Sequence, residues 1–159
     1  MKKMQLILGA ILVLTATPTI AETDLLQTSV DSLVAKFDES KDTVYLTVTL
    51  GRCSALFAVI QGVLKRDANK DVYIGVPERL QDVAWTLTYK KLEERGVDID
   101  DDRQITISND LNDEFISFVK AYSSRMEANR KASGDMWSSD SLITADLKAC
   151  DWVTSAVGN

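Results

Sequence analysis

A stretch of twelve residues, DANKDVYIGVPE at 67–78, has the spacing of a calcium-binding loop. An EF-hand loop needs oxygen ligands at its first, third and fifth places and a carboxylate at its twelfth. The side chains at those places are Asp67, Asn69, Asp71 and Glu78. The sixth place, where such a loop turns sharply on a glycine, is Val72, a β-branched residue that resists a positive φ angle. A calcium-binding module is therefore an alternative hypothesis, and a polar connection between two helices is favoured.

The two cysteines of the chain, Cys53 and Cys150, predict a disulfide bond. An even pair of cysteines in an exported chain is most simply bonded, and the alternative is two buried free thiols. Their spacing matches neither a CxxC redox motif nor a zinc-binding motif, and the sequence predicts no cofactor. The bond would join the last predicted helix to a long central one.

Arg52 lies on an apolar stripe of that central helix, which is an unusual place for a charge. A buried guanidinium is costly unless a carboxylate meets it. Asp146 lies one helical turn before Cys150 and is the first candidate partner, and Asp151 is the second. We therefore predict a buried ion pair beside the disulfide. The alternative is that Arg52 extends along its alkyl stem to solvent.

The sequence contains no histidine, which excludes a Ser-His-Asp or Cys-His nucleophile and any imidazole metal ligand. Glu93, Asp102 and Ser108 have a spacing like that of some phage-type lysozymes, but one such spacing is expected by chance among 24 acidic residues. A catalytic pair of carboxylates also needs one raised pKa in an apolar pocket, and this segment is expected to be wet. A carboxylate-based glycosidase is a minor alternative, and we do not expect an enzyme.

The chain is acidic, with a formal net charge of −6. An acidic protein repels the phosphate backbone of nucleic acids, so we expect no nucleic-acid partner. The acids are most concentrated between Glu93 and Glu114, where they could form a docking surface for a basic partner. The alternative is a solvated segment with acids at the start of a helix.

Residues 1–21 have the features of a secretory signal peptide, with Lys2 and Lys3, a short apolar run, and small residues before a cleavage point after Ala21. We expect residues 22–159 to be one exported helical domain, periplasmic or secreted. The leader's apolar run is too short to span a bilayer. No later run is expected to be long and uninterrupted enough, so no stable membrane insertion is expected once the leader is removed.

Apolar periodicity predicts an all-α fold, with about five helices in a single bundle-like domain. The predicted helices cover residues 24–38, 42–66, 78–95, 109–132 and 141–156. The segment 42–66 is apolar over so wide an arc that we expect it to be the central helix.

An α/β fold with a small sheet is the alternative architecture, with strands at residues 43–50, 71–76 and 103–108. Residues 43–50 alternate in polarity and are rich in valine and threonine, as many strands are. One long helix is favoured because its apolar stripe continues in phase across Gly51.

Binding rather than catalysis is the function that these observations predict. A small exported, disulfide-stabilised helical protein without catalytic motifs is expected, by elimination, to be an accessory, inhibitor or immunity-type envelope protein. Its expected partner is another protein.

Overall fold

The computed structural model of the protein describes residues 24–64 and 73–158, which form an all-α fold. The elements in these ranges are a 3-10 helix η1 (Asp24–Leu26) and the α-helices α1 (Val30–Ser40), α2 (Thr43–Leu64), α3 (Val76–Glu94), α4 (Asp101–Ser133) and α5 (Ser141–Val157). The predicted fold class is confirmed. The α/β alternative is wrong over the described residues, because 43–50 belong to α2, 103–108 belong to α4, and 73–75 are a turn.

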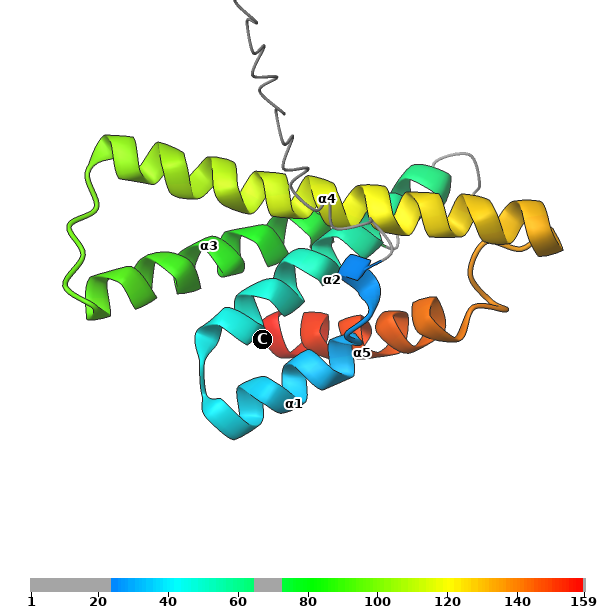
Figure 1. Ribbon diagram of the computed structural model, residues 1–159, viewed down its shortest axis with the longest axis horizontal. Coiled ribbons are helices and arrows are strands. Elements are labelled where there is room, and N and C mark those ends of the chain that lie inside the picture. Colours follow the sequence, from blue (N-terminus) through cyan, green and yellow to red (C-terminus); the bar gives the residue numbers. More distant parts are fainter. Residues whose placement is uncertain (1–23, 65–72, 159) are drawn as a thin grey trace, which may run out of the picture.

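The central element is α2, which packs against α1, α3, α4 and α5. Figure 1 shows it lying between the α3–α4 pair and the α1–α5 pair. Every residue from 52 to 57 is buried, and Leu50 and Ile60 extend the buried set toward both ends of the helix. This wide buried arc is the one predicted from the stripe that continues across Gly51.

The length and composition of α2 are also those of a membrane span, and α2 is the one helix of the described residues of which this is true. The expectation that no segment beyond the leader meets this criterion is therefore wrong. A helix that is apolar on all sides belongs either in a bilayer or at the centre of a bundle. Half of the apolar window of α2 is already buried against the other helices, as in the core helix of a bundle.

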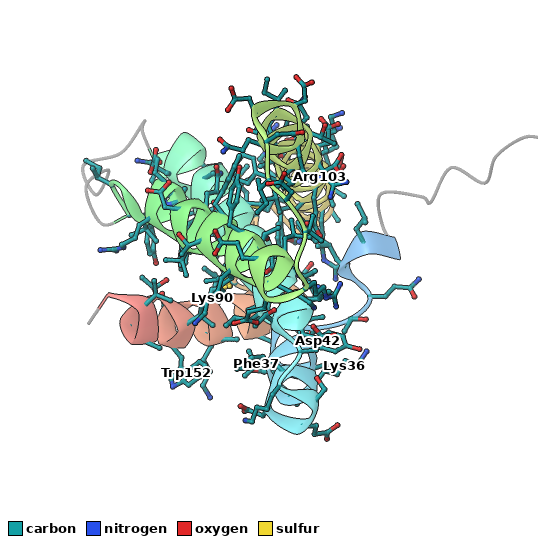
Figure 2. All side chains as sticks on the ribbon, turned by 90° about the vertical axis from the view of Figure 1, so that its left-hand side faces the viewer. Lys36, Phe37, Asp42, Lys90, Arg103 and Trp152 are labelled. Carbon is teal, nitrogen blue, oxygen red and sulfur yellow. A yellow bond between two sulfur atoms is a disulfide. The ribbon has the colours of Figure 1, made fainter. Side chains whose placement is uncertain are left out.

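The helices α3 and α4 both pack on α2 but make few contacts with each other. Figure 1 shows them running antiparallel, with the joined ends, near residues 95–100, extending beyond the other helices. Figure 2 faces this end of the molecule, and Lys90 on α3 and Arg103 on α4 both lie at its surface. The two helices thus pack mainly on α2 and only slightly on each other.

The helix α4 begins eight residues earlier than predicted, at Asp101 instead of 109. Asp100 is its N-cap, and its carboxylate accepts a hydrogen bond from the backbone N–H of Arg103 at 2.9 Å. Asp101 and Asp102 then lie at the positive end of the helix dipole. The cap and these charges outweigh the β preference of the isoleucines and threonine at 105–107, which is only a weak influence on local structure.

The N-terminal segment is also not the single helix predicted over 24–38. Ser29 caps α1, which begins at Val30, and the residues before it leave the helical path after η1. The reason is tertiary, because the carbonyl groups of Leu26 and Thr28 accept hydrogen bonds from Arg52 of α2. These contacts hold the residues before Ser29 against α2, and the Ser29 cap then starts α1 at Val30.

Candidate functional site

Arg52 is buried in the centre of the fold, with 1% of its surface exposed. Its Nη2 atom lies 2.5 Å from Oδ2 of Asp146, which is fully buried, and its Nε donates to the hydroxyl of Tyr122 at 2.9 Å. The remaining donors reach the carbonyl groups of Leu26 and Thr28. The structure therefore places Arg52 against the first of the two candidate carboxylates and not in solvent.

The Asp146 carboxylate is fully used within the protein. Its Oδ2 accepts a hydrogen bond of 2.6 Å from the Tyr122 hydroxyl, and its Oδ1 accepts one of 3.1 Å from the backbone N–H of Val30. Burial, and after it the neighbouring Asp146, raise the pKa of Tyr122, so its hydroxyl keeps its proton and donates it. A charge pair so enclosed is not accessible to a substrate, and the cluster is a structural lock joining α1, α2, α4 and α5.

The disulfide lies beside this lock. The sulfur atoms of Cys53 and Cys150 are 2.04 Å apart and their Cα atoms 5.3 Å apart, so the bond joins α2 to α5 as predicted. Asp151, the second candidate partner of Arg52, is exposed on α5 instead. Consecutive residues of a helix lie on different faces. Because Cys150 faces the core, Asp151 faces away from it.

Three of the four residues suggested for calcium, Asp67, Asn69 and Asp71, lie outside the described residues. Glu78, the fourth, is exposed in the first turn of α3, where it favours the positive end of the helix. No group of three or more acidic or cysteine side chains able to hold a metal ion is present in 24–64 and 73–158.

The carboxylates considered for a glycosidase are both on the surface. Glu93 is exposed near the end of α3 and Asp102 is exposed in the first turn of α4. Both are open to solvent, whereas a catalytic acid whose pKa is raised by its surroundings lies in an apolar pocket.

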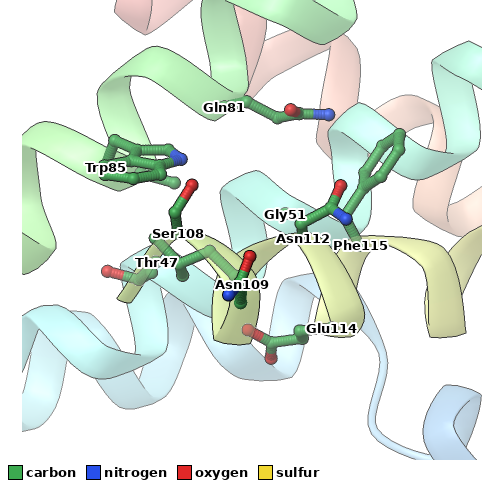
Figure 3. Close-up of a pocket in the computed structure, with 11 residues that line it drawn as sticks. Thr47, Gly51, Gln81, Trp85, Ser108, Asn109, Asn112, Glu114 and Phe115 are labelled. Carbon is green, nitrogen blue, oxygen red and sulfur yellow. The ribbon is translucent and has the colours of Figure 1, made fainter. Parts of the chain in front are cut away.

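A cleft of about 240 Å³ opens between α3 and α4, with α2 as its floor. Figure 3 shows the side chains of α3 and α4 facing each other across it. Its lining is mostly neutral and consists of Thr47, Gly51, Gln81, Ala84, Trp85, Ser108, Asn109, Leu111, Asn112, Glu114 and Phe115. A concave site with apolar walls and a few convergent polar groups is the usual form of a small-molecule site.

Gly51 keeps the floor of this cleft open. It lies within α2, where a glycine costs about 1 kcal/mol relative to alanine. No close neighbour requires the missing side chain, because a Cβ atom built on Gly51 would meet nothing within 4 Å. Its φ angle is not positive either, so the backbone does not require glycine. The remaining effect of the glycine is that the space above residue 51, inside the cleft, stays free of a side chain.

Three polar side chains of the cleft are available to a ligand, and Thr47 is not among them because its hydroxyl donates to the carbonyl group of Thr43. Ser108, Asn109 and Asn112 form no side-chain hydrogen bond or ion pair with any described residue, whereas Gln81 donates to Ser54. Glu114 is the one ionisable side chain among the lining residues, and burial raises its pKa. The cleft thus presents donors and acceptors with little fixed charge.

Trp85, which forms an aromatic wall of the cleft, packs against a neighbouring ring outside the cleft. The rings of Trp85 and Tyr89, one turn apart on α3, stack with centroids 5.3 Å apart and an angle of 20° between their planes. The cleft adjoins a second hollow, of about 360 Å³, which shares Thr47 and Glu114 with it and is also lined by Lys91 and Arg95. A ligand longer than the first cleft would extend into this hollow.

Comparison with protein families, with curated proteins and with solved structures finds no match to this chain. Any assignment of function therefore depends on the geometry of the molecule itself.

The cleft could not be identified from sequence patterns. Its residues come from three helices and are separated by more than sixty positions between Thr47 and Asn112, so no local motif joins them. The one available signal was Gly51, a helix-breaking residue in the middle of an apolar stripe, and a glycine at that place indicates nothing by itself about which helices surround it.

Proposed function

We propose that this protein acts by binding a ligand in the cleft between α3 and α4. The observation that carries the proposal is Gly51, which leaves open space in a cleft where the side chains of Ser108, Asn109 and Asn112 have no hydrogen-bond partner in the described part of the chain. A glycine within a helix lowers the stability of that helix, and Gly51 does so without allowing any closer packing. A binding site that needs this space would explain why a glycine stands there despite the loss of helix stability.

Binding rather than catalysis is supported by the composition of the cleft. Its lining contains a single ionisable group, Glu114, and neither a lysine nor a cysteine. Acid–base or nucleophilic catalysis needs a pair of groups with matched pKa values, which this lining does not supply. Among the classes of binding protein expected from the sequence, an accessory protein fits best, because a small concave cleft is suited to a compact ligand rather than to a flat protein interface.

Export of the protein is part of the same proposal. The leader-like residues 1–21 and the disulfide support a periplasmic or secreted location, since disulfides persist in oxidising compartments. The chain produced with its own leader in a bacterial host should be recovered from the periplasm or medium, and its mass should correspond to a start at Glu22. Recovery of the uncleaved chain from the cytoplasm would contradict export.

The binding site can be mapped while the ligand is still unidentified. The exported chain, labelled with ¹⁵N, is titrated with a mixed collection of small fragments, and shifted amide signals are assigned. We expect fragments to shift the signals of Gly51 and of residues 108–112 on α4.

A matched pair of variants provides the control. Gly51→Leu places a side chain in the cleft, and Gly62→Leu makes the same change in the same helix, where a Cβ also meets nothing within 4 Å. Gly62 lines a different hollow, between α2 and α4. We expect Gly51→Leu alone to abolish the shifts. Equal binding to both variants, or shifts confined to another face, would refute the site.

A further inference from the structure

The polar lining of the cleft matches a ligand that carries hydroxyl groups. A side-chain amide offers two donors and an acceptor, and a serine hydroxyl both donates and accepts. Asn109, Asn112 and Ser108 all lie on one stretch of α4 and line the cleft together. Groups that both donate and accept pair well with hydroxyl or amide groups, which do the same.

The charge of the cleft argues against ionic ligands. No lysine or arginine is among its lining residues, so a phosphate or carboxylate would lose its hydration without meeting a cation. Glu114 adds a negative charge when ionised, which further disfavours anions, and one half-buried carboxyl whose pKa is raised by burial is a poor partner for a cation. A neutral ligand is therefore favoured.

The aromatic walls add a requirement for a flat apolar face. Trp85 is fixed by its stack on Tyr89, and Phe115 lies across the cleft from it on α4. A rigid indole binds an apolar face at low cost in conformational entropy. Among neutral hydroxyl-rich compounds, the pyranose ring of a sugar has such a face, made of its axial C–H groups, with hydroxyl groups around its rim.

We infer that the cleft over Gly51 binds a neutral sugar, with the ring against Trp85 and its hydroxyl or N-acetyl groups on Ser108, Asn109 and Asn112. This inference depends on the proposed binding function and names its ligand class. The adjoining hollow shares Thr47 and Glu114 with the cleft and provides room for a second ring, and Lys91 and Arg95 line this hollow but not the cleft over Gly51. An oligosaccharide should therefore bind more tightly than its single sugar unit.

The inference is tested with pyranose sugars of different charge. N-acetylglucosamine and its β-1,4-linked disaccharide are the neutral probes, glucosamine is the cationic probe, and glucuronate is the anionic one. Binding to the exported chain is measured by saturation-transfer NMR at millimolar sugar, and by the change in tryptophan fluorescence. We expect the neutral sugars to bind, the disaccharide more tightly, and both charged sugars to bind at least several-fold more weakly.

Three variants locate the bound sugar. Gly51→Leu should abolish binding, and Gly62→Leu should leave it unchanged. Asn112→Leu removes exposed hydrogen-bonding groups without disturbing the core, and should weaken binding by about threefold to tenfold, the effect of one or two hydrogen bonds. Circular dichroism and thermal melting establish that each variant is folded.

The outcomes separate this inference from the proposed function. Lack of any response to the neutral sugars, equal binding of glucuronate, or unchanged binding by Gly51→Leu would overturn the sugar assignment. If a neutral tripeptide, included as a further probe, binds in the cleft while the sugars do not, the cleft remains a binding site and its ligand is a peptide. If neither sugars nor fragments bind there, both proposals are wrong.

Discussion

The guanidinium of Arg52 and the carboxylate of Asp146 meet at 2.5 Å in the centre of the fold, although they are 94 positions apart in the chain. The Tyr122 hydroxyl contacts both groups. Asp146 also accepts from the N–H of Val30 at the start of α1, and Arg52 donates to two carbonyl groups of the segment before it. A pair so completely buried stabilises the fold only while both charges are present, because either one alone would be an uncompensated charge in the interior.

Breaking this pair should be strongly destabilising. We expect Arg52→Met or Asp146→Leu alone to lower the free energy of unfolding by about 3–5 kcal/mol, and the double variant to recover a large part of the loss. Urea denaturation of the four proteins completes a double-mutant cycle. Additive losses in the double variant would show that the two side chains are not coupled.

The contribution of Tyr122 is smaller, because only its hydroxyl takes part in the lock. Tyr122→Phe keeps the buried ring and removes one donor to Asp146 and one acceptor from Arg52. We expect a loss of about 1–3 kcal/mol in the free energy of unfolding. A change within the error of the urea titration would mean that the charged pair is satisfied without the tyrosine.

The disulfide should contribute mainly by restricting the unfolded chain. It closes a loop across a sequence separation of 97 residues, for which chain entropy predicts about 4–5 kcal/mol. Replacing both Cys53 and Cys150 by alanine should lower the urea midpoint accordingly, with the reduced wild-type chain as the control. An unchanged midpoint in both samples would contradict a bonded pair.

Asp140 should make stability depend on acid pH. Burial alone would raise the pKa of this carboxyl, but hydrogen bonds from Arg125, Asn129 and the N–H of Ile143 outweigh it and hold the pKa below the ordinary value of 3.8. The stabilisation is therefore complete above the unfolded pKa and is lost as the pH falls through the lower folded pKa.

The matching variants separate the charge of Asp140 from its role as the N-cap of α5. Asp140→Asn keeps a capping side chain, and its difference in melting temperature from wild type should be large at pH 6 and should shrink below pH 3.8. Asp140→Ala also loses the cap, which costs about 1 kcal/mol more. A difference between wild type and Asp140→Asn that does not vary with pH would contradict the assignment.

The first turns of α4 should open easily, because the buried residues of this helix begin only at Phe118. Asp100→Ala removes the cap, worth about 1 kcal/mol, and should speed amide hydrogen exchange over residues 101–107 about fivefold while leaving the global melting temperature nearly unchanged. Asp101→Ala, which changes the neighbouring acid but leaves the cap, is the control. Equal effects of the two changes would show that charge, not capping, holds these turns.

Local patterns in the sequence were sufficient for the class of the fold and for the Arg52–Asp146 pair, but not for the part that Tyr122 takes in the lock. The apolar stripe of α2 continues in phase across Gly51, so its helical period was readable without tertiary information. Asp146 lies one turn before Cys150, and a disulfide from Cys53 brings that turn next to Arg52. Spacing along two helices and one covalent bond were thus enough to choose Asp146 over Asp151.

Only the tertiary structure decided what holds the segment before α1 and where the candidate site lies. Ser29, the cap of α1, is a local signal for the start of that helix, but nothing in the local sequence shows that Arg52 of α2 binds the carbonyl groups of Leu26 and Thr28. The cleft exists because α3 and α4 rest on α2 while diverging from each other. The angle between two helices is set by how side chains of all three pack together, and a periodic pattern within one helix carries no information about it.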